Sequence, residues 1–551
     1  MSNGDSVSFN KQLTLRGIII GVIGSAVLTM SSMYVALKLG ALPWPIIFAA
    51  LVSMFFLKLL GNTNVHEINV THTAMSAGAM TAGGLAFTLP GIYMLNPAAN
   101  INFLQLSIIV TGGVVLGLIF TALIRKYFVE TANLPYAMGI AAAETIMAGD
   151  KSGKKAITLF VSIGASGVFT FFRDGIPAFF GKTFIPAALM NQKMLSYGSA
   201  AGIWFSPMLI SIGYIIGPLA IGVWFLGALI SDFGILIGGT KLGFFDASIA
   251  AALKSSLGIG LMVGTGIGII IKGVIPKAKE IFAPMFKKAS YSSGFIDLRW
   301  APILIAALAL VLTIVCKMGV VASIITILGV WLATAMSAQV VGQSGINPME
   351  IFGIIVLLAA KAVSAIGQTE AFFIAAIAAI ACGLVGDVLN DFKAGNILKT
   401  NPKAQWLAEC VGGLAGVFVS VGVFYVILKA YGPDSFGVGK MFTAPQAGAV
   451  AAMVGGIPNV PAFVAGIAAA CLLYIFNVPV MTLGLGVYLP FYLSLTAFIG
   501  GALSFAVKKA APSLEKSGKP LVVASGVLGG EAFVGVVIAI IQASAGFSAL
   551  K

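Results

Sequence analysis

The chain has 551 residues, of which 59% are hydrophobic and only 9% are charged. Soluble domains carry about 25% charged residues, and a surface this apolar would aggregate in water, so a soluble enzyme or binding module is excluded. The net charge of +14 does not indicate nucleic-acid binding, because the basic residues gather in short segments between apolar runs, as in the cytoplasmic loops of membrane proteins. The composition therefore predicts an integral membrane protein with many spans.

Apolar runs long enough to cross a bilayer as helices recur along the chain. Helix is expected because an open sheet leaves backbone groups unsatisfied in lipid. The first part is predicted to span the membrane near residues 14–37, 42–60, 69–95, 101–124, 156–172, 202–217, 218–238 and 248–272. The second part is predicted to span it near residues 300–316, 318–339, 347–366, 369–389, 404–429, 459–477, 480–507 and 520–542. The expected fold is an all-α polytopic membrane protein of about 16 transmembrane helices.

A basic segment near residues 272–299 separates two equal sets of predicted spans. It predicts an N-terminal transmembrane half over residues 1–290 and a C-terminal transmembrane half over residues 291–551. Lys11 and Arg16 precede the first span, and such positive residues favour the cytoplasmic side. We expect a multi-pass protein of the inner (plasma) membrane with a cytoplasmic N-terminus. The first apolar run is too long for a cleavable signal and is expected to be a span.

Two segments are too short to cross the bilayer on their own. Residues 134–149 lie between a proline and a glycine and cover about 24 Å as a helix. Residues 445–457 lie between two prolines. Re-entrant or half helices in both halves of a chain are typical of the binding sites of transporters. A helix packed at the membrane interface is an equal alternative for each segment.

Polar side chains inside predicted spans are costly in lipid and mark candidate functional positions. Glu144 and Gln446 lie in the two short segments, and Lys361 and Gln368 would share one polar helix face. A lysine that faces a cavity could bind a substrate carboxylate, and a structural ion pair is the alternative. The predicted substrate-binding residues are Glu144, Gln343, Asn347, Lys361, Gln368 and Gln446.

Buried carboxyl and imidazole groups are candidates for carrying protons. The predicted proton-coupling residues are Glu67, His72, Asp387 and Glu531. A polar start to the third span is the alternative for Glu67 and His72. His66 and His72 are six residues apart and point to different faces of a helix, so they do not form the zinc motif H-E-x-x-H. We expect no catalytic residue, no resident metal and no cofactor.

The most charged stretch between long apolar runs is residues 383–412. Asp387 and Asp391 are four residues apart and share one helix face, as do Gln405 and Glu409 on the next helix. The lysines between these two helices predict a basic cytoplasmic loop. A gating or structural role is predicted for Asp391, Lys393, Gln405 and Glu409.

This stretch also carries a family resemblance. Its sequence GDVLNDFKAGNILKTNPKAQ resembles the D-L-K-x-G-x-x-L…P-R-x-Q region of the oligopeptide transporter (OPT) family, with Phe392 and Lys403 in place of the usual Leu and Arg. Further segments similar to that family, in the same order, are QLTLRGIIIGVIGSAVLTMSSMYVALKLG, LPYAMGIAAAE, FTAPQAGAVAAMVGG, GLGVYLPFYLSLTAFIGGAL and GGEAFVGVVIAI. The resemblance covers nearly the whole chain and is closest to the prokaryotic branch, although LPYAMG has Pro-x-x-x-Gly where that branch usually has P-x-G.

The resemblance implies a secondary active transporter with two duplicated halves. It would import small oligopeptides with protons by alternating access, and uptake of metal chelates (siderophore- or nicotianamine-like complexes) is the alternative. A membrane pump is disfavoured, because 18 scattered acidic residues do not indicate a multi-Mg²⁺ site, and a passive channel is a third class. The expected partners are a peptide or chelate substrate, protons and the lipid bilayer, without nucleic acid, and a homodimer is left open.

Overall fold

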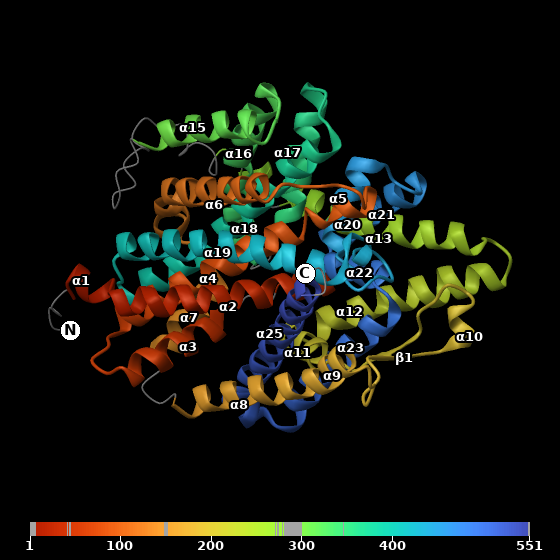
Figure 1. Cartoon of the computed structure of the whole chain (residues 1–551), viewed down its shortest axis with the longest axis horizontal. Helices are drawn as coiled ribbons and strands as arrows, with labels where there is room; N and C mark the ends of the chain where they lie inside the picture. Colours follow the sequence, from red (N-terminus) through yellow and green to blue (C-terminus); the bar gives the residue numbers. More distant parts are fainter. Residues whose placement is uncertain are drawn as a thin grey trace.

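The protein is built almost entirely of α-helices in the computed structural model (Figure 1). The structure describes residues 7–40, 42, 46–147, 153–269, 271–272, 275–277, 279, 300–344 and 347–548. Within these residues, 11 helices are long and apolar enough to cross a membrane, and further apolar helices are shorter. The prediction of an all-α polytopic membrane protein is confirmed.

Helices make up most of the described residues, together with one short pair of strands. The first part of the chain forms α1 (Phe9–Gln12), α2 (Leu15–Leu39), α3 (Ile46–Leu59), α4 (Val65–Ala86), α5 (Pro90–Leu95), α6 (Phe103–Arg125), α7 (Ala137–Met147), α8 (Gly153–Thr170), α9 (Ile176–Phe180), α10 (Gln192–Leu195), α11 (Pro207–Ile216), α12 (Pro218–Ala228) and α13 (Ala247–Ile269). An antiparallel pair, β1 (Ala188–Met190) and β2 (Gly202–Trp204), flanks α10. The second part forms α15 (Ala301–Ile314), α16 (Val320–Ser344), α17 (Met349–Val363), α18 (Gln368–Leu398), α19 (Pro402–Tyr431), α20 (Pro445–Gly455), α21 (Val460–Ile475), α22 (Val480–Tyr488), α23 (Phe491–Ala510), α24 (Pro512–Lys516) and α25 (Lys519–Ser548).

Helix α18 is the central element of the fold. The membrane-length window within it is 100% buried. It contacts α4, α6, α7, α16, α17, α19 and α20, and it runs between α6 and α19 in Figure 1. Its first half is rich in alanine, and small side chains let neighbouring helices approach closely inside a membrane.

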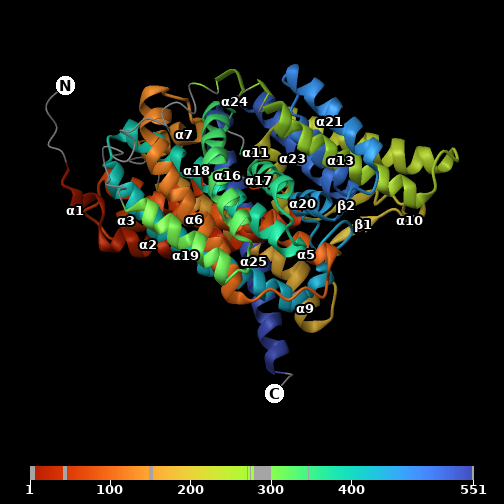
Figure 2. The same cartoon turned by 90° about the horizontal axis from the view of Figure 1, so that it is seen from above.

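Helix α18 and the helices that contact it form one group, and a second group packs beside it (Figure 2). In this group α25 contacts α8 and α11, while α13 contacts α21 and α22. Helix α25 also contacts α2 and α19 and thereby joins the two groups. Both groups contain helices from before and after residue 290, and the predicted boundary lies outside the described residues. The division into an N-terminal and a C-terminal half therefore stays a prediction.

The two short segments form short helices, as predicted. Helices α7 and α20 have 11 residues each, or about 16 Å. Helix α7 lies against the last third of α18, where the Gly139 N–H donates to Asn390 Oδ1 at 3.0 Å. Helix α20 lies near the start of α18, where Phe372 and the Ala447 carbonyl both face Gly91. Phe372 and Asn390 are about 27 Å apart along the helix, so the short helices contact α18 far from each other.

Several predicted boundaries are wrong; the predicted span 202–217, for example, begins as strand β2 and becomes helical only at Pro207. Helix α18 was expected to end near residue 389 but continues to Leu398. The stretch KAGNIL has no proline to stop it, and burial of its first residues outweighs the low helix propensity of Gly395 and Asn396. Lys393 consequently lies in a buried helix and not in a loop, and the predicted loop is reduced to residues 399–401. The predicted span 480–507 is divided into α22 and α23, because Pro490 has no N–H to donate and its ring interrupts the helix.

Close packing of α19 against α4 leads to a first prediction. A Cβ added at Gly412 would lie 1.9 Å from the Ala74 carbonyl oxygen, whereas one added at Gly422 of the same helix meets nothing within 4 Å. Overpacking costs about 1–3 kcal/mol, so we expect Gly412→Ala to lower the melting temperature of the detergent-solubilised protein by several degrees. Gly422→Ala is the matched control and should not lower it. Equal melting temperatures for the two variants would contradict this packing.

Candidate functional site

A cluster of acidic side chains lies where α18, α19 and α4 meet. Asp387 and Asp391 come from successive turns of α18, and Glu409 comes from α19. One carboxylate oxygen from each lies within 4.8 Å of the others, and all three side chains are buried. The four-residue spacing explains why both aspartates reach the same place.

His72 of α4 completes this acid cluster. Its Nδ1 lies 3.7 Å from Asp391 Oδ1, and the hydroxyl of Ser76, one turn further on, donates to Asp391 Oδ2 at 2.6 Å. Among the described residues, both ring nitrogens of His72 and all carboxylate oxygens of Asp387 and Glu409 have no hydrogen-bond partner. Such groups are normally paired when they are buried. The cluster is therefore a candidate for binding and releasing a proton or a cation.

The charge of the acid cluster is not balanced by a permanent cation. Among the described residues, no lysine or arginine lies within ion-pair distance of Asp387, Asp391 or Glu409. Three negative charges within 4.8 Å repel strongly in a medium of low dielectric constant. Neutralisation requires protons, which imidazole and carboxyl groups both bind, or a hard cation, which carboxylate oxygens coordinate.

Gln405 and Lys393 fix the backbone around the cluster. Gln405 Nε2 donates to the Asp391 carbonyl at 2.8 Å, and its side-chain amide fits against Gly395, where an added Cβ would lie 1.8 Å from Gln405 Oε1. Lys393 Nζ donates to Asn133 Oδ1 at 2.7 Å, just before α7. These contacts join α18 to α19 and to the segment that enters α7.

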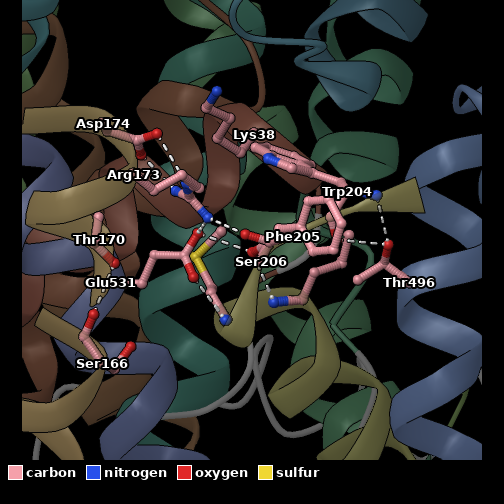
Figure 3. A network of polar contacts seen from close by, with 12 residues as sticks. Lys38, Ser166, Thr170, Arg173, Asp174, Trp204, Phe205, Ser206, Thr496 and Glu531 are labelled. Atoms are coloured by element: carbon pink, nitrogen blue, oxygen red, sulfur yellow. Dashed lines mark hydrogen bonds and ion pairs between the residues drawn. The ribbon is translucent and has the colours of Figure 1, made fainter. Parts of the chain in front are cut away.

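The other two residues predicted to couple protons are each held by an arginine. Glu67 pairs with Arg16 at 2.7 Å and accepts two threonine hydroxyls. Glu531 lies 3.0 Å from Arg173 and accepts a serine hydroxyl and a backbone N–H at the start of α11; Figure 3 shows this second arrangement. A proton role for either carboxylate would require its ion pair to open, and it stays a prediction.

Two of the predicted substrate-binding residues lie together. Lys361 and Gln368 line a pocket of about 340 Å³ at the end of α20. Lys361 Nζ donates to the carbonyls of Met453 and Val454 at 3.2 and 3.3 Å. These carbonyls belong to the last turn of α20, where a cation interacts favourably with the helix dipole.

The remaining predicted substrate-binding residues lie elsewhere. Asn347 Nδ2 donates to the Cys382 carbonyl at 2.9 Å and ties the start of α17 to α18. Gln446 Nε2 donates to the Gly40 carbonyl at 2.9 Å, at the end of α2. Glu144 is exposed on α7, and the side chain of Gln343 lies outside the described residues. The six predicted residues therefore do not form one site.

Sequence reasoning missed several buried cations, among them Lys38 and Arg173, which lie close together. Lys38 stands near the end of the first span, where a lysine is ordinarily expected to reach the interface. Arg173 and Asp174 directly follow a predicted span, in FFRDGIP. An Arg-Asp pair beside aromatic residues in so apolar a chain was the available signal. Figure 3 shows both cations in one polar network around Trp204 and Glu531.

Comparison with known proteins extends over nearly the whole chain. The model of a family described as "OPT oligopeptide transporter protein" matches residues 12–542. A protein of Haemophilus influenzae named "Putative oligopeptide transporter" is 26% identical over 603 residues, covering 93% of this chain and 93% of the relative.

An amide substitution should have different effects on a buried carboxylate that lacks a cationic partner and on one that pairs with an arginine. Asp387→Asn removes a buried charge without a partner and should leave the melting temperature of the solubilised protein unchanged or higher. Glu531→Gln removes a charge that Arg173 pairs with and should lower it, because breaking a buried ion pair costs about 3–5 kcal/mol. A lower melting temperature for Asp387→Asn than for Glu531→Gln would refute the assignment.

Proposed function

Because the chain belongs to the OPT oligopeptide transporter family, we propose that it imports small oligopeptides together with protons by alternating access. Family membership makes the chain a membrane transporter and not an enzyme. We propose the peptide substrate, the proton coupling and the alternating-access cycle. It also includes an inner-membrane location with a cytoplasmic N-terminus.

The acid cluster is the observation that carries the proposal. Asp387, Asp391 and Glu409 are buried between membrane-length helices, and His72 lies beside them. Carboxylates inside a membrane domain are costly unless they are neutralised. Uptake of protons from one side and release to the other would change the charge of this cluster during each cycle. We therefore assign proton binding to the cluster, which unites Asp387 and His72, the two members that the sequence predicts for this role, with Asp391 and Glu409.

Helix α18 offers a physical connection from the cluster to the short helices. Asn390, next to Asp391, accepts the Gly139 N–H near the start of α7, and α18 also contacts α20. A change in repulsion between α18 and α19 would alter how α18 packs against both short helices. Alternating access in transporters commonly involves such interrupted helices around a central site. Protonation would thus favour one of two packings, as coupling requires.

Uptake by the purified protein in liposomes tests the function. An inward proton gradient should drive accumulation of labelled alanyl-alanine above its equilibrium level, and a protonophore should abolish the accumulation. Replacing sodium and divalent cations in the buffer should have no effect, because a proton neutralises the cluster. Uptake that only equilibrates would indicate a channel and overturn the proposal. Competition by Fe(III) chelates but not by unlabelled di- and tripeptides would favour the chelate alternative.

Substitution in the cluster should separate coupling from translocation. In Asp387→Asn liposomes we expect gradient-driven accumulation to fall at least about tenfold, because the group that exchanges a proton is lost. Exchange of labelled against unlabelled peptide, which needs no net proton movement, should continue. Asp434→Asn changes an exposed acid and is the control, with normal accumulation. Wild-type accumulation in Asp387→Asn would rule out this role for Asp387.

A further inference from the structure

An apolar cavity of about 590 Å³ lies where the two groups of helices meet. Its walls come from α4 and the short helix α7 of the group around α18, from α8, α11 and α25 of the second group, and from α2 and α3. The volume is within the roughly 300–1,000 Å³ of small-molecule sites. Among the described residues that line the cavity, the only polar ones are three serines. The cavity therefore suits a ligand that is mostly apolar.

Two of these serines, Ser31 and Ser32 of α2, bring hydroxyl groups without partners to the cavity. Each residue is only 6% exposed, and within the described part of the chain neither hydroxyl has a hydrogen-bond partner. The third, Ser525, donates to the Leu521 carbonyl of its own helix at 2.9 Å. A buried hydroxyl without a partner is costly. A ligand that fits this cavity should thus offer polar groups to Ser31 and Ser32 and apolar groups to the other walls.

Two methionines of the cavity wall are next in the chain to residues that contact α18. Met75 immediately precedes the serine whose hydroxyl donates to Asp391 Oδ2 at 2.6 Å. Met138 immediately precedes Gly139, whose N–H donates to Asn390 Oδ1 at 3.0 Å. A ligand that moved either methionine would therefore act on the contacts of the acid cluster. This position is the one that a transported substrate coupled to the cluster requires.

We propose that this cavity binds the side chains of the transported peptide and that the protein selects peptides with apolar side chains. This inference rests on the proposed import of peptides and names the class of peptide. Burial of a side chain such as leucine favours binding in proportion to the area removed from water. Ser31 and Ser32 would pair with N–H and C=O groups of the peptide backbone. The acyl chain of a lipid would fill the apolar space but leave both hydroxyls unpaired.

The test compares two unlabelled dipeptides of nearly the same shape in liposomes that contain the purified protein. An inward proton gradient drives uptake of labelled alanyl-alanine, and leucyl-leucine or asparaginyl-asparagine is added as a competitor. The two side chains are similar in size, and only that of leucine gains from contact with apolar walls. Leucyl-leucine should therefore halve the uptake at a roughly tenfold lower concentration than asparaginyl-asparagine.

A leucine at position 529 should fill the cavity and remove this preference. Gly529 of α25 lines the cavity, and a Cβ added there would lie 3.4 Å from Phe48 Cε2, an ordinary contact. In the uptake that remains in Gly529→Leu, we expect the half-inhibitory concentration of leucyl-leucine to rise roughly tenfold. Gly164→Leu is the matched control on α8. A Cβ added there meets nothing within 4 Å, and Gly164 does not line the cavity, so this variant should behave as the wild type.

Alanine in place of both serines tests the contacts to the peptide backbone. The double variant Ser31→Ala, Ser32→Ala should raise the half-maximal concentration of alanyl-alanine and the half-inhibitory concentration of leucyl-leucine severalfold and by the same factor, because both peptides have the same backbone. Unchanged values would overturn the role of the two hydroxyls.

The outcomes separate this inference from the proposed function. If the wild type accumulates no dipeptide, peptide import fails and the inference fails with it. If the wild type accumulates alanyl-alanine but does not prefer leucyl-leucine, or if Gly529→Leu keeps the preference, only the inference is overturned. Phospholipid that copurifies with the wild type and not with Gly529→Leu, together with an unchanged peptide preference, would show that a lipid occupies the cavity and would also overturn it.

A second variant decides if Gly529→Leu accumulates no peptide. Met138→Gln keeps nearly the same volume and places a polar amide in the wall of the cavity. A reduced preference for leucyl-leucine over asparaginyl-asparagine in this variant supports the inference, and an unchanged preference overturns it.

Discussion

The rest of the structure depends on the burial of two carboxylates in helix α18. Its membrane-length window is fully enclosed by protein, and its small side chains let α4, α6 and α19 pack closely around it. That packing brings Glu409 and His72 up to Asp387 and Asp391. The acids cannot relax into water, so their charge acts directly on the contacts between α18 and its neighbours. The charge of the cluster and the packing of the central helix are therefore linked properties.

The protein buries acids in two different ways. Glu531 has Arg173 at 3.0 Å and further donors around it, and Asp232 has Lys254 and two serine hydroxyls. Such pairs keep a fixed net charge in every conformation that preserves them. Among the described residues, Asp387 and Glu409 have no cationic partner and accept no hydrogen bond within normal distance, so their neutralisation depends on an exchangeable proton or ion. This difference in partners, and not burial itself, distinguishes candidates for coupling from structural ion pairs.

Local features of the sequence predicted the elements well and their contacts poorly. Apolar runs located most helices, prolines and glycines located α7 and α20, and four-residue spacing placed Asp387 and Asp391 on one face. No local spacing reveals that His72 of α4 meets Asp391, or that Trp204 and Phe442 surround Lys38. Those contacts depend on which distant helices pack together. The surroundings of Lys38 were therefore not predictable, although the neighbouring Arg173-Asp174 pair was unusual within its own segment.

The proposed coupling site is joined to helix α2 by close packing. Helix α2, which carries Lys38 near its end, packs on α4, which carries His72, and on α19, which carries Glu409. An added Cβ at Gly21 would lie 2.6 Å from Ala74 Cβ, and the Ser25 hydroxyl donates to the Gly412 carbonyl at 3.0 Å. Such contacts leave little room for α2 to slide along α4 and α19. A shift of α4 and α19 away from α18 would carry α2 with it. A change of charge in the cluster would then act on α2 through the close packing of three helices, a contiguous physical connection of the kind that coupling between distant sites requires.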